Sequence, residues 1–62
     1  MSHKIMEKYI GRMCLIYTLD NHVQGMIKSI EGSWLEVECG KHKKIELVNV
    51  EFVEKIEILI QK

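Results

Sequence analysis

Residues 23–37 read VQGMIKSIEGSWLEV, and this stretch decides the fold class. Hydrophobic and polar residues alternate through it with the two-residue period of a β-strand, on both sides of the turn sequence Glu31-Gly32-Ser33. Gly25 interrupts the first alternating run near its middle, where a glycine lets a strand bend sharply. Gly32 stands in the turn that joins the two strands into a hairpin. We therefore expect Gly25 and Gly32 to be structural residues of a bent hairpin.

Strand-like segments also occupy the rest of the chain from Arg12 onward. The expected strands cover residues 12–20, 22–30, 34–39, 44–50 and 52–60. No proline occurs in the chain, so none of these strands is barred from a central position. Turn signals recur at intervals of roughly 8–12 residues, which is typical of small sandwiches and barrels. The sequence predicts a mainly β fold: a five-stranded, strongly bent antiparallel barrel of the SH3-like or Sm-like kind.

A short helix is expected before the barrel, over about residues 2–10 (SHKIMEKYI). Ser2 can cap its start, and Gly11 can end it in a left-handed conformation. Two isolated helical turns are unstable in water, so the helix must lie on the barrel. Its expected contact face consists of Ile5, Met6, Tyr9 and Ile10. The chain is then one domain, residues 1–62, with the barrel over about residues 12–60.

A chain of 62 residues needs help beyond its core. A core of this size rarely supplies more than about 3–5 kcal/mol, so disulfides, metals or partner subunits usually contribute. Cys14 and Cys39 lie in apolar runs and are interpreted as buried thiols, with a disulfide between neighbouring strands as the alternative. The three histidines lack the short spacing of zinc sites, so we expect no metal and no cofactor. Self-association is the favoured source of stability.

Charge and motif content narrow the functional classes. Nine basic and nine acidic residues give no net charge, which removes the simplest argument for nucleic-acid binding. The one basic cluster, Lys41-His42-Lys43-Lys44, is interpreted mainly as a solvated hairpin tip. No nucleophile–base pair and no glycine-rich phosphate loop is readable, so we do not expect an enzyme. Every apolar run is short and interrupted by charge, so we expect a cytoplasmic protein without a membrane partner.

Two of the expected strands are apolar on both faces, whereas a small barrel turns one face of each strand to water. In the first strand Cys14 and Ile16 oppose Leu15 and Tyr17, and in the fourth Ile45 and Leu47 oppose Val48 and Val50. A subunit interface explains this surplus, and pairing of free strand edges between copies points the same way. The expected interface residues are Leu15, Tyr17, Val48 and Val50.

The helix, the five strands and the glycine-bent second strand together resemble the Sm-like family over about residues 3–60. That family includes bacterial RNA chaperones and the spliceosomal ring proteins. Val23-Gln24-Gly25 with Ile27 matches its motif of a hydrophobe, any residue, glycine and a second hydrophobe, and Ile30-Glu31 matches its hydrophobe–acid pair. The segments YIGR, IYT, GSWLEV and FVEKIEI resemble a subfamily of very small bacterial members. The resemblance implies a homo-oligomeric ring, a hexamer or a heptamer.

The positions that hold RNA in many Sm-like proteins carry other residues here. Leu35 replaces the asparagine of the third strand, and residues 48–52 read VNVEF instead of Arg-Gly or Tyr-Lys-His. A non-catalytic, self-assembling interaction module is therefore the favoured function, with docking of another protein at a strand edge left open. The alternative is a ring that binds single-stranded RNA, with aromatic side chains as stacking platforms. Its candidate RNA-binding residues are Asn49, Lys41, Lys43, Lys44 and Trp34.

Overall fold

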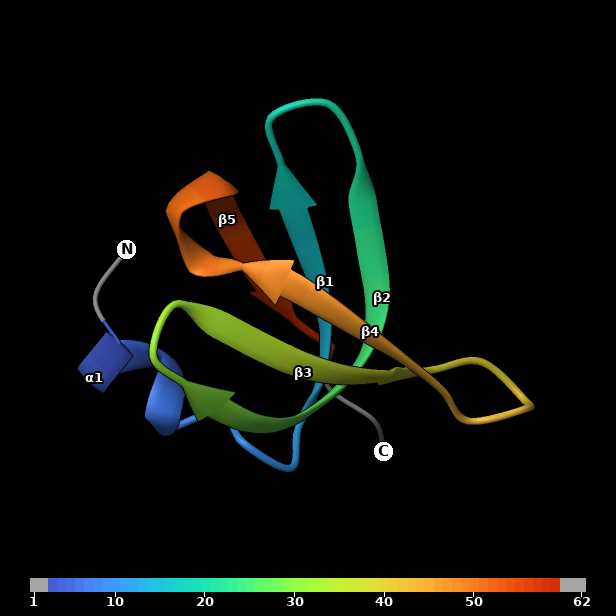
Figure 1. Cartoon of the computed structure of the whole chain (residues 1–62). Coiled ribbons are helices and arrows are strands. Elements are labelled where there is room, and N and C mark those ends of the chain that lie inside the picture. The colour runs from blue at the N-terminus through green and yellow to red at the C-terminus, as the bar shows by residue number, and fades with distance from the viewer. Residues whose placement is uncertain (1–2, 60–62) are drawn as a thin grey trace.

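The computed structural model describes residues 3–59 as a five-stranded sheet with one short α-helix. The elements are α1 (His3–Glu7), β1 (Met13–Thr18), β2 (His22–Glu31), β3 (Trp34–Cys39), β4 (Lys44–Asn49), the 3-10 helix η1 (Val50–Phe52) and β5 (Val53–Ile58). All strand pairs are antiparallel, in the order β4-β3-β2-β1-β5 (Figure 1). The predicted mainly β fold is confirmed. The sheet is not closed, so β4 and β5 are its two edges.

The second strand, β2, changes its partner along its length. Its first half pairs with β1, from His22 opposite Tyr17 to Met26 opposite Met13. Its second half pairs with β3, from Met26 opposite Glu38 to Glu31 opposite Trp34. Gly25 lies where the two pairings meet. A Cβ atom built there would lie 2.5 Å from the Glu38 carbonyl oxygen and 2.8 Å from Val37 Cγ1. The backbone of β3 therefore passes Gly25 at a distance that only glycine permits.

The core lies on the inner face of the bent sheet and draws on every element. Its buried residues are Met6, Cys14, Ile16, Ile27, Leu35, Val37, Val48, Val50 and Val53. Val48 and Val50 are only 7% and 2% exposed, so their side chains pack in the core of their own chain rather than on the surface that was predicted to meet a partner subunit. Val48 lies opposite the buried Leu35, and the Val50 N–H donates to the Ser33 carbonyl oxygen at 2.8 Å. The other face of β4, with Ile45 and Leu47, is the exposed one.

The N-terminal helix is shorter than predicted, because α1 ends at Glu7 and turns follow it. The expected cap, Ser2, lies outside the described residues. Met6 is fully buried and Tyr9 packs against the core, but Ile5 and Ile10 are 52% and 43% exposed. The predicted four-residue contact face is therefore half wrong, since the helical spacing does not continue to Ile10. Between residues 3 and 59 no helix is long and apolar enough to span a bilayer.

Candidate functional site

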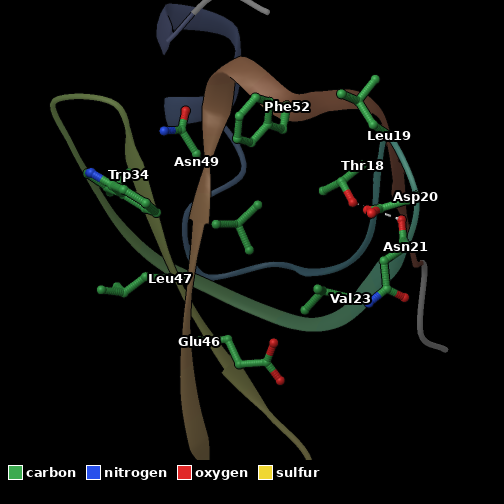
Figure 2. Close-up of a pocket in the computed structure, with 11 residues that line it drawn as sticks. Thr18, Leu19, Asp20, Asn21, Val23, Trp34, Glu46, Leu47, Asn49 and Phe52 are labelled. Atoms are coloured by element: carbon green, nitrogen blue, oxygen red, sulfur yellow. Dashed lines mark hydrogen bonds between the residues drawn. The ribbon is translucent and has the colours of Figure 1, made fainter.

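Large exposed apolar side chains gather at one place on the surface, around a groove of about 530 Å³. Figure 2 shows the groove between β4 and the end of the β1–β2 hairpin. Its exposed apolar residues are Leu19, Trp34, Leu47 and Phe52. Exposed apolar side chains that form one contiguous patch often mark an interaction site, whereas scattered single ones are normal on protein surfaces. The groove is therefore the candidate functional site.

The groove is built around the free edge of β4. Glu46, Leu47, Val48 and Asn49 are consecutive, and all four line it. Successive side chains of a strand point to opposite faces, so the groove takes residues from both faces of β4 and wraps its edge. In the sheet, β4 has a hydrogen-bonded neighbour on one side alone, β3. A free strand edge within an apolar groove is a ready contact site for another chain.

The far wall of the groove is the turn between β1 and β2, which local hydrogen bonds hold in shape. The Thr18 hydroxyl donates to the Asn21 carbonyl oxygen at 3.1 Å, and the Thr18 N–H donates to the same oxygen at 2.8 Å. Asn21 Oδ1 accepts the His22 N–H at 2.8 Å. Thr and Asn favour turns because their side chains form hydrogen bonds with nearby backbone groups, as Thr18 and Asn21 do here. The turn therefore places Leu19 and Asp20 on the groove wall in a defined conformation.

The groove is acidic, although the chain as a whole carries no net charge. Among residues 3–59, Asp20 and Glu46 are the charged residues that line the groove, and no lysine, arginine or histidine of that range does so. The one ion pair within residues 3–59 joins Lys55 Nζ to Glu57 Oε2 at 3.8 Å, away from the groove. Asp20 and Glu46 therefore face solvent in this part of the chain without a cationic partner. A groove of this kind attracts cationic groups.

Trp34 and Asn49, two of the predicted RNA-binding residues, are brought together by the strand register. They lie directly opposite each other on β3 and β4. Trp34 is 49% exposed, so it is not buried in the core. Asn49 Oδ1 accepts the Glu51 N–H at 2.9 Å and caps η1, which leaves the side-chain amide nitrogen as a donor. Figure 2 shows Asn49 between the side chains of Trp34 and Phe52.

The predicted RNA-binding lysines lie at the other end of the same hairpin. Lys44 is opposite Cys39, five positions along β4 from Asn49, which corresponds to about 17 Å of strand. Lys41 and Lys43 lie in the turn beyond it and are exposed. Figure 1 shows this turn projecting from the body of the domain. The structure therefore divides the predicted RNA-binding residues into two separate groups.

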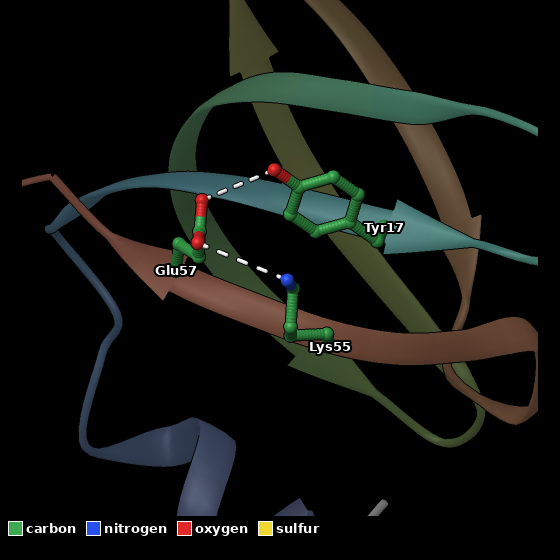
Figure 3. Close-up of polar contacts among 3 residues, drawn as sticks. All are labelled: Tyr17, Lys55 and Glu57. Carbon is green, nitrogen blue, oxygen red and sulfur yellow. Dashed lines mark hydrogen bonds and ion pairs between the residues drawn. The ribbon is translucent and has the colours of Figure 1, made fainter.

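The two remaining predicted interface residues, Leu15 and Tyr17, lie half-buried on β1. The Tyr17 hydroxyl donates to Glu57 Oε1 at 3.1 Å, and Lys55 Nζ lies 4.5 Å from the centre of the Tyr17 ring (Figure 3). The hydrogen bond to Glu57, with partial desolvation and the negative charge of Glu57, raises the pKa of Tyr17. Tyr17 is thus held by its own sheet neighbours, and a subunit contact through Leu15 and Tyr17 stays a prediction.

Neither cysteine lies in an environment that activates a thiol, and residues 3–59 contain no cluster of metal-binding side chains. Cys14 is buried and Cys39 is half-buried, and both are free thiols. Burial raises the pKa of both, and the charge of Glu46 raises that of Cys39 further. A raised pKa keeps a thiol protonated and weakly nucleophilic at neutral pH. Across residues 3–59 no three side chains of the metal-binding types come together.

No family model matches this chain, and neither a curated protein nor a solved structure shows significant similarity to it. The Sm-like resemblance therefore rests on the glycine motif and on the order of the elements. Sequence reasoning missed Leu19, Asp20, Glu46 and Phe52 as residues of the groove. Asp20 was readable as a turn residue, but nothing in the linear sequence places the 18–21 turn opposite β4.

Proposed function

We propose that this chain is a non-catalytic interaction module with an Sm-like, SH3-like barrel fold, which assembles with copies of itself into a ring. The observation that carries the proposal is the free edge of β4 within an apolar groove. A second free edge, β5, stands at the other end of the strand order. One molecule thus carries two unpaired edges, which soluble proteins usually cover.

Covering the exposed apolar side chains of the groove also favours association. Fully burying a large apolar side chain stabilises by about 1.5–3 kcal/mol. The four apolar residues of the groove are each about half exposed, so covering them is worth roughly 1 kcal/mol apiece. That sum is comparable to the roughly 3–5 kcal/mol that a core of this size supplies alone. Association therefore makes a real contribution to the stability of so small a domain.

Native mass spectrometry on protein purified without nuclease treatment tests this proposal. We expect an assembly of six or seven copies of the 7.3-kDa chain. The mass also reports any nucleic acid that travels with the protein. A species that remains monomeric at protein concentrations of tens of micromolar and above would contradict self-assembly, and the free edges would then be covered in another way.

Binding of single-stranded RNA is the second candidate, and the pairing of Trp34 with Asn49 favours it. An exposed indole can stack on a base, and stacking contributes about 1–3 kcal/mol per base. The neighbouring amide nitrogen of Asn49 can donate to a base edge or a phosphate. We expect Trp34→Ala to weaken binding of a short labelled oligonucleotide by about 5- to 150-fold in fluorescence anisotropy, which is that energy expressed as an affinity ratio.

Two further variants make this measurement specific. Ile45→Ala removes an exposed apolar side chain of the same strand outside the groove, so it should leave RNA affinity nearly unchanged. Lys43→Glu with Lys44→Glu shows whether the distant lysines contribute, because loss of phosphate contacts flattens the salt dependence. Equal binding by Trp34→Ala and the unmodified chain would argue against a stacking site.

A further inference from the structure

We infer that the acidic groove of one copy receives the basic turn of the next copy, where the basic turn is residues 41–44, the end of the β3–β4 turn and the first residue of β4. The inference rests on the proposed self-assembly and names the two surfaces that meet. A second copy is the occupant because this chain carries a surface complementary to its own groove. The two surfaces match in charge and in shape, and their positions suit a contact between copies.

The charges of the two surfaces are opposite and uncompensated. Asp20 and Glu46 line the groove, and within the described part of the chain no basic residue lines it. Lys41 and Lys43 are exposed in the turn, and residues 41–44 contain no acid. None of these four residues belongs to the one ion pair found within residues 3–59. Asp20 lies in the β1–β2 turn and Lys41 and Lys43 lie in the β3–β4 turn, so these unpaired opposite charges can meet those of another copy.

The basic turn has the shape of a narrow projection. Gly40 and Lys43 have φ values of +73° and +53°, and the Lys43 N–H donates to the Gly40 carbonyl oxygen at 3.2 Å. A groove of about 530 Å³ falls within the roughly 300–1,000 Å³ that encloses a ligand of a few side chains. Lysine stems are apolar while their ends are charged. They can cover Leu19 and Leu47 while their ammonium groups reach Asp20 and Glu46.

Within one molecule the turn lysines and the groove carboxylates form no ion pair in residues 3–59, although Lys44 and Glu46 lie two positions apart on β4. Figure 1 shows the basic turn pointing away from the β1–β2 turn, which forms the far wall of the groove. The contact therefore joins two different surfaces of two copies, which is a heterologous, head-to-tail arrangement. Such contacts close into rings or continue as filaments, depending on the rotation between copies. A head-to-tail contact is what a ring requires.

A charge exchange tests this contact. We expect the acidic-turn variant, Lys41→Glu with Lys43→Glu, to be monomeric, because its turn and its groove repel. The basic-groove variant, Asp20→Lys with Glu46→Lys, should be monomeric for the converse reason. An equimolar mixture of the two should form assemblies with an even number of copies, since each acidic turn then meets a basic groove and each basic turn an acidic one. Sedimentation velocity or size-exclusion chromatography with light scattering reports the masses.

The matched controls change the same number of charges elsewhere on the surface. Lys8→Glu with Lys28→Glu, and Glu7→Lys with Glu54→Lys, alter exposed residues outside the groove and the basic turn. Both should assemble like the unmodified chain, and far-ultraviolet circular dichroism should show every variant folded. If the acidic-turn and basic-groove variants each assemble normally, the contact is wrong and self-assembly stands. If the unmodified chain is a monomer, self-assembly fails and this contact fails with it.

Discussion

Gly25→Ala is expected to remove most of the stability of the domain. The added Cβ atom would meet the Glu38 carbonyl oxygen at 2.5 Å and Val37 Cγ1 at 2.8 Å. The first of these is backbone in the middle of the sheet, so it cannot move aside without breaking the pairing of β2 with β3. Overpacking typically costs about 1–3 kcal/mol, and contact with fixed backbone places this site at the upper end of that range, against a total stability of roughly 3–5 kcal/mol. Circular dichroism during thermal and urea unfolding measures the loss.

Gly32→Ala is the matched control, because it adds the same methyl group to a glycine in open space. No atom lies within 4 Å of the Cβ position at Gly32, although its φ of +57° disfavours alanine. The expected cost is therefore about 1 kcal/mol, which the fold survives. Equal unfolding midpoints for the two variants would mean that the close approach of β3 is not what demands glycine at position 25.

The strand pattern of this chain was readable because each strand is short, alternating and bounded by turn residues. The expected third strand, residues 34–39, coincides with β3, and the fourth and fifth differ from β4 and β5 by one or two residues at their ends. The 3-10 helix η1 was missed, because Val50-Glu51-Phe52 also reads as strand. The Asn49 side chain caps η1 by accepting the Glu51 N–H, and Val50 packs in the core. These two contacts determine the conformation of residues 50–52, and neither can be read from the linear sequence.

The choice of buried face on β4 was not predictable from composition. Ile45 and Leu47 are as apolar as Val48 and Val50, so alternation alone allowed either pair to face the core. The tight connection into η1 turns Val48 and Val50 inward and leaves Leu47 exposed. The same connection also forms the groove, because it places Leu47, Asn49 and Phe52 on the surface of the domain. The candidate site therefore depends on how β4 connects to η1, and not on the hydrophobic alternation along β4.

Adjacent substitutions on β4, Val48→Lys and Leu47→Lys, are expected to have opposite consequences. Val48 is 7% exposed and lies opposite the buried Leu35, so a lysine there places a charge in the core without a partner. Burial of an unpaired charge costs several kcal/mol, which exceeds the stability of so small a domain. We expect Val48→Lys to be unfolded by circular dichroism and to lose its cooperative thermal transition.

Leu47→Lys should stay folded and lose the ability to assemble. Leu47 is 63% exposed and lies opposite Glu36, so a lysine there gains an opposite-charge neighbour across the strands. In the groove, the same change removes apolar surface and repels the basic turn of the next copy. Its unfolding midpoint should match that of the unmodified chain at protein concentrations where both are monomeric, because association otherwise adds stability by mass action. A folded Leu47→Lys variant that assembles normally would remove the groove from the interface, while a folded Val48→Lys variant would mean that Val48 is not in the core.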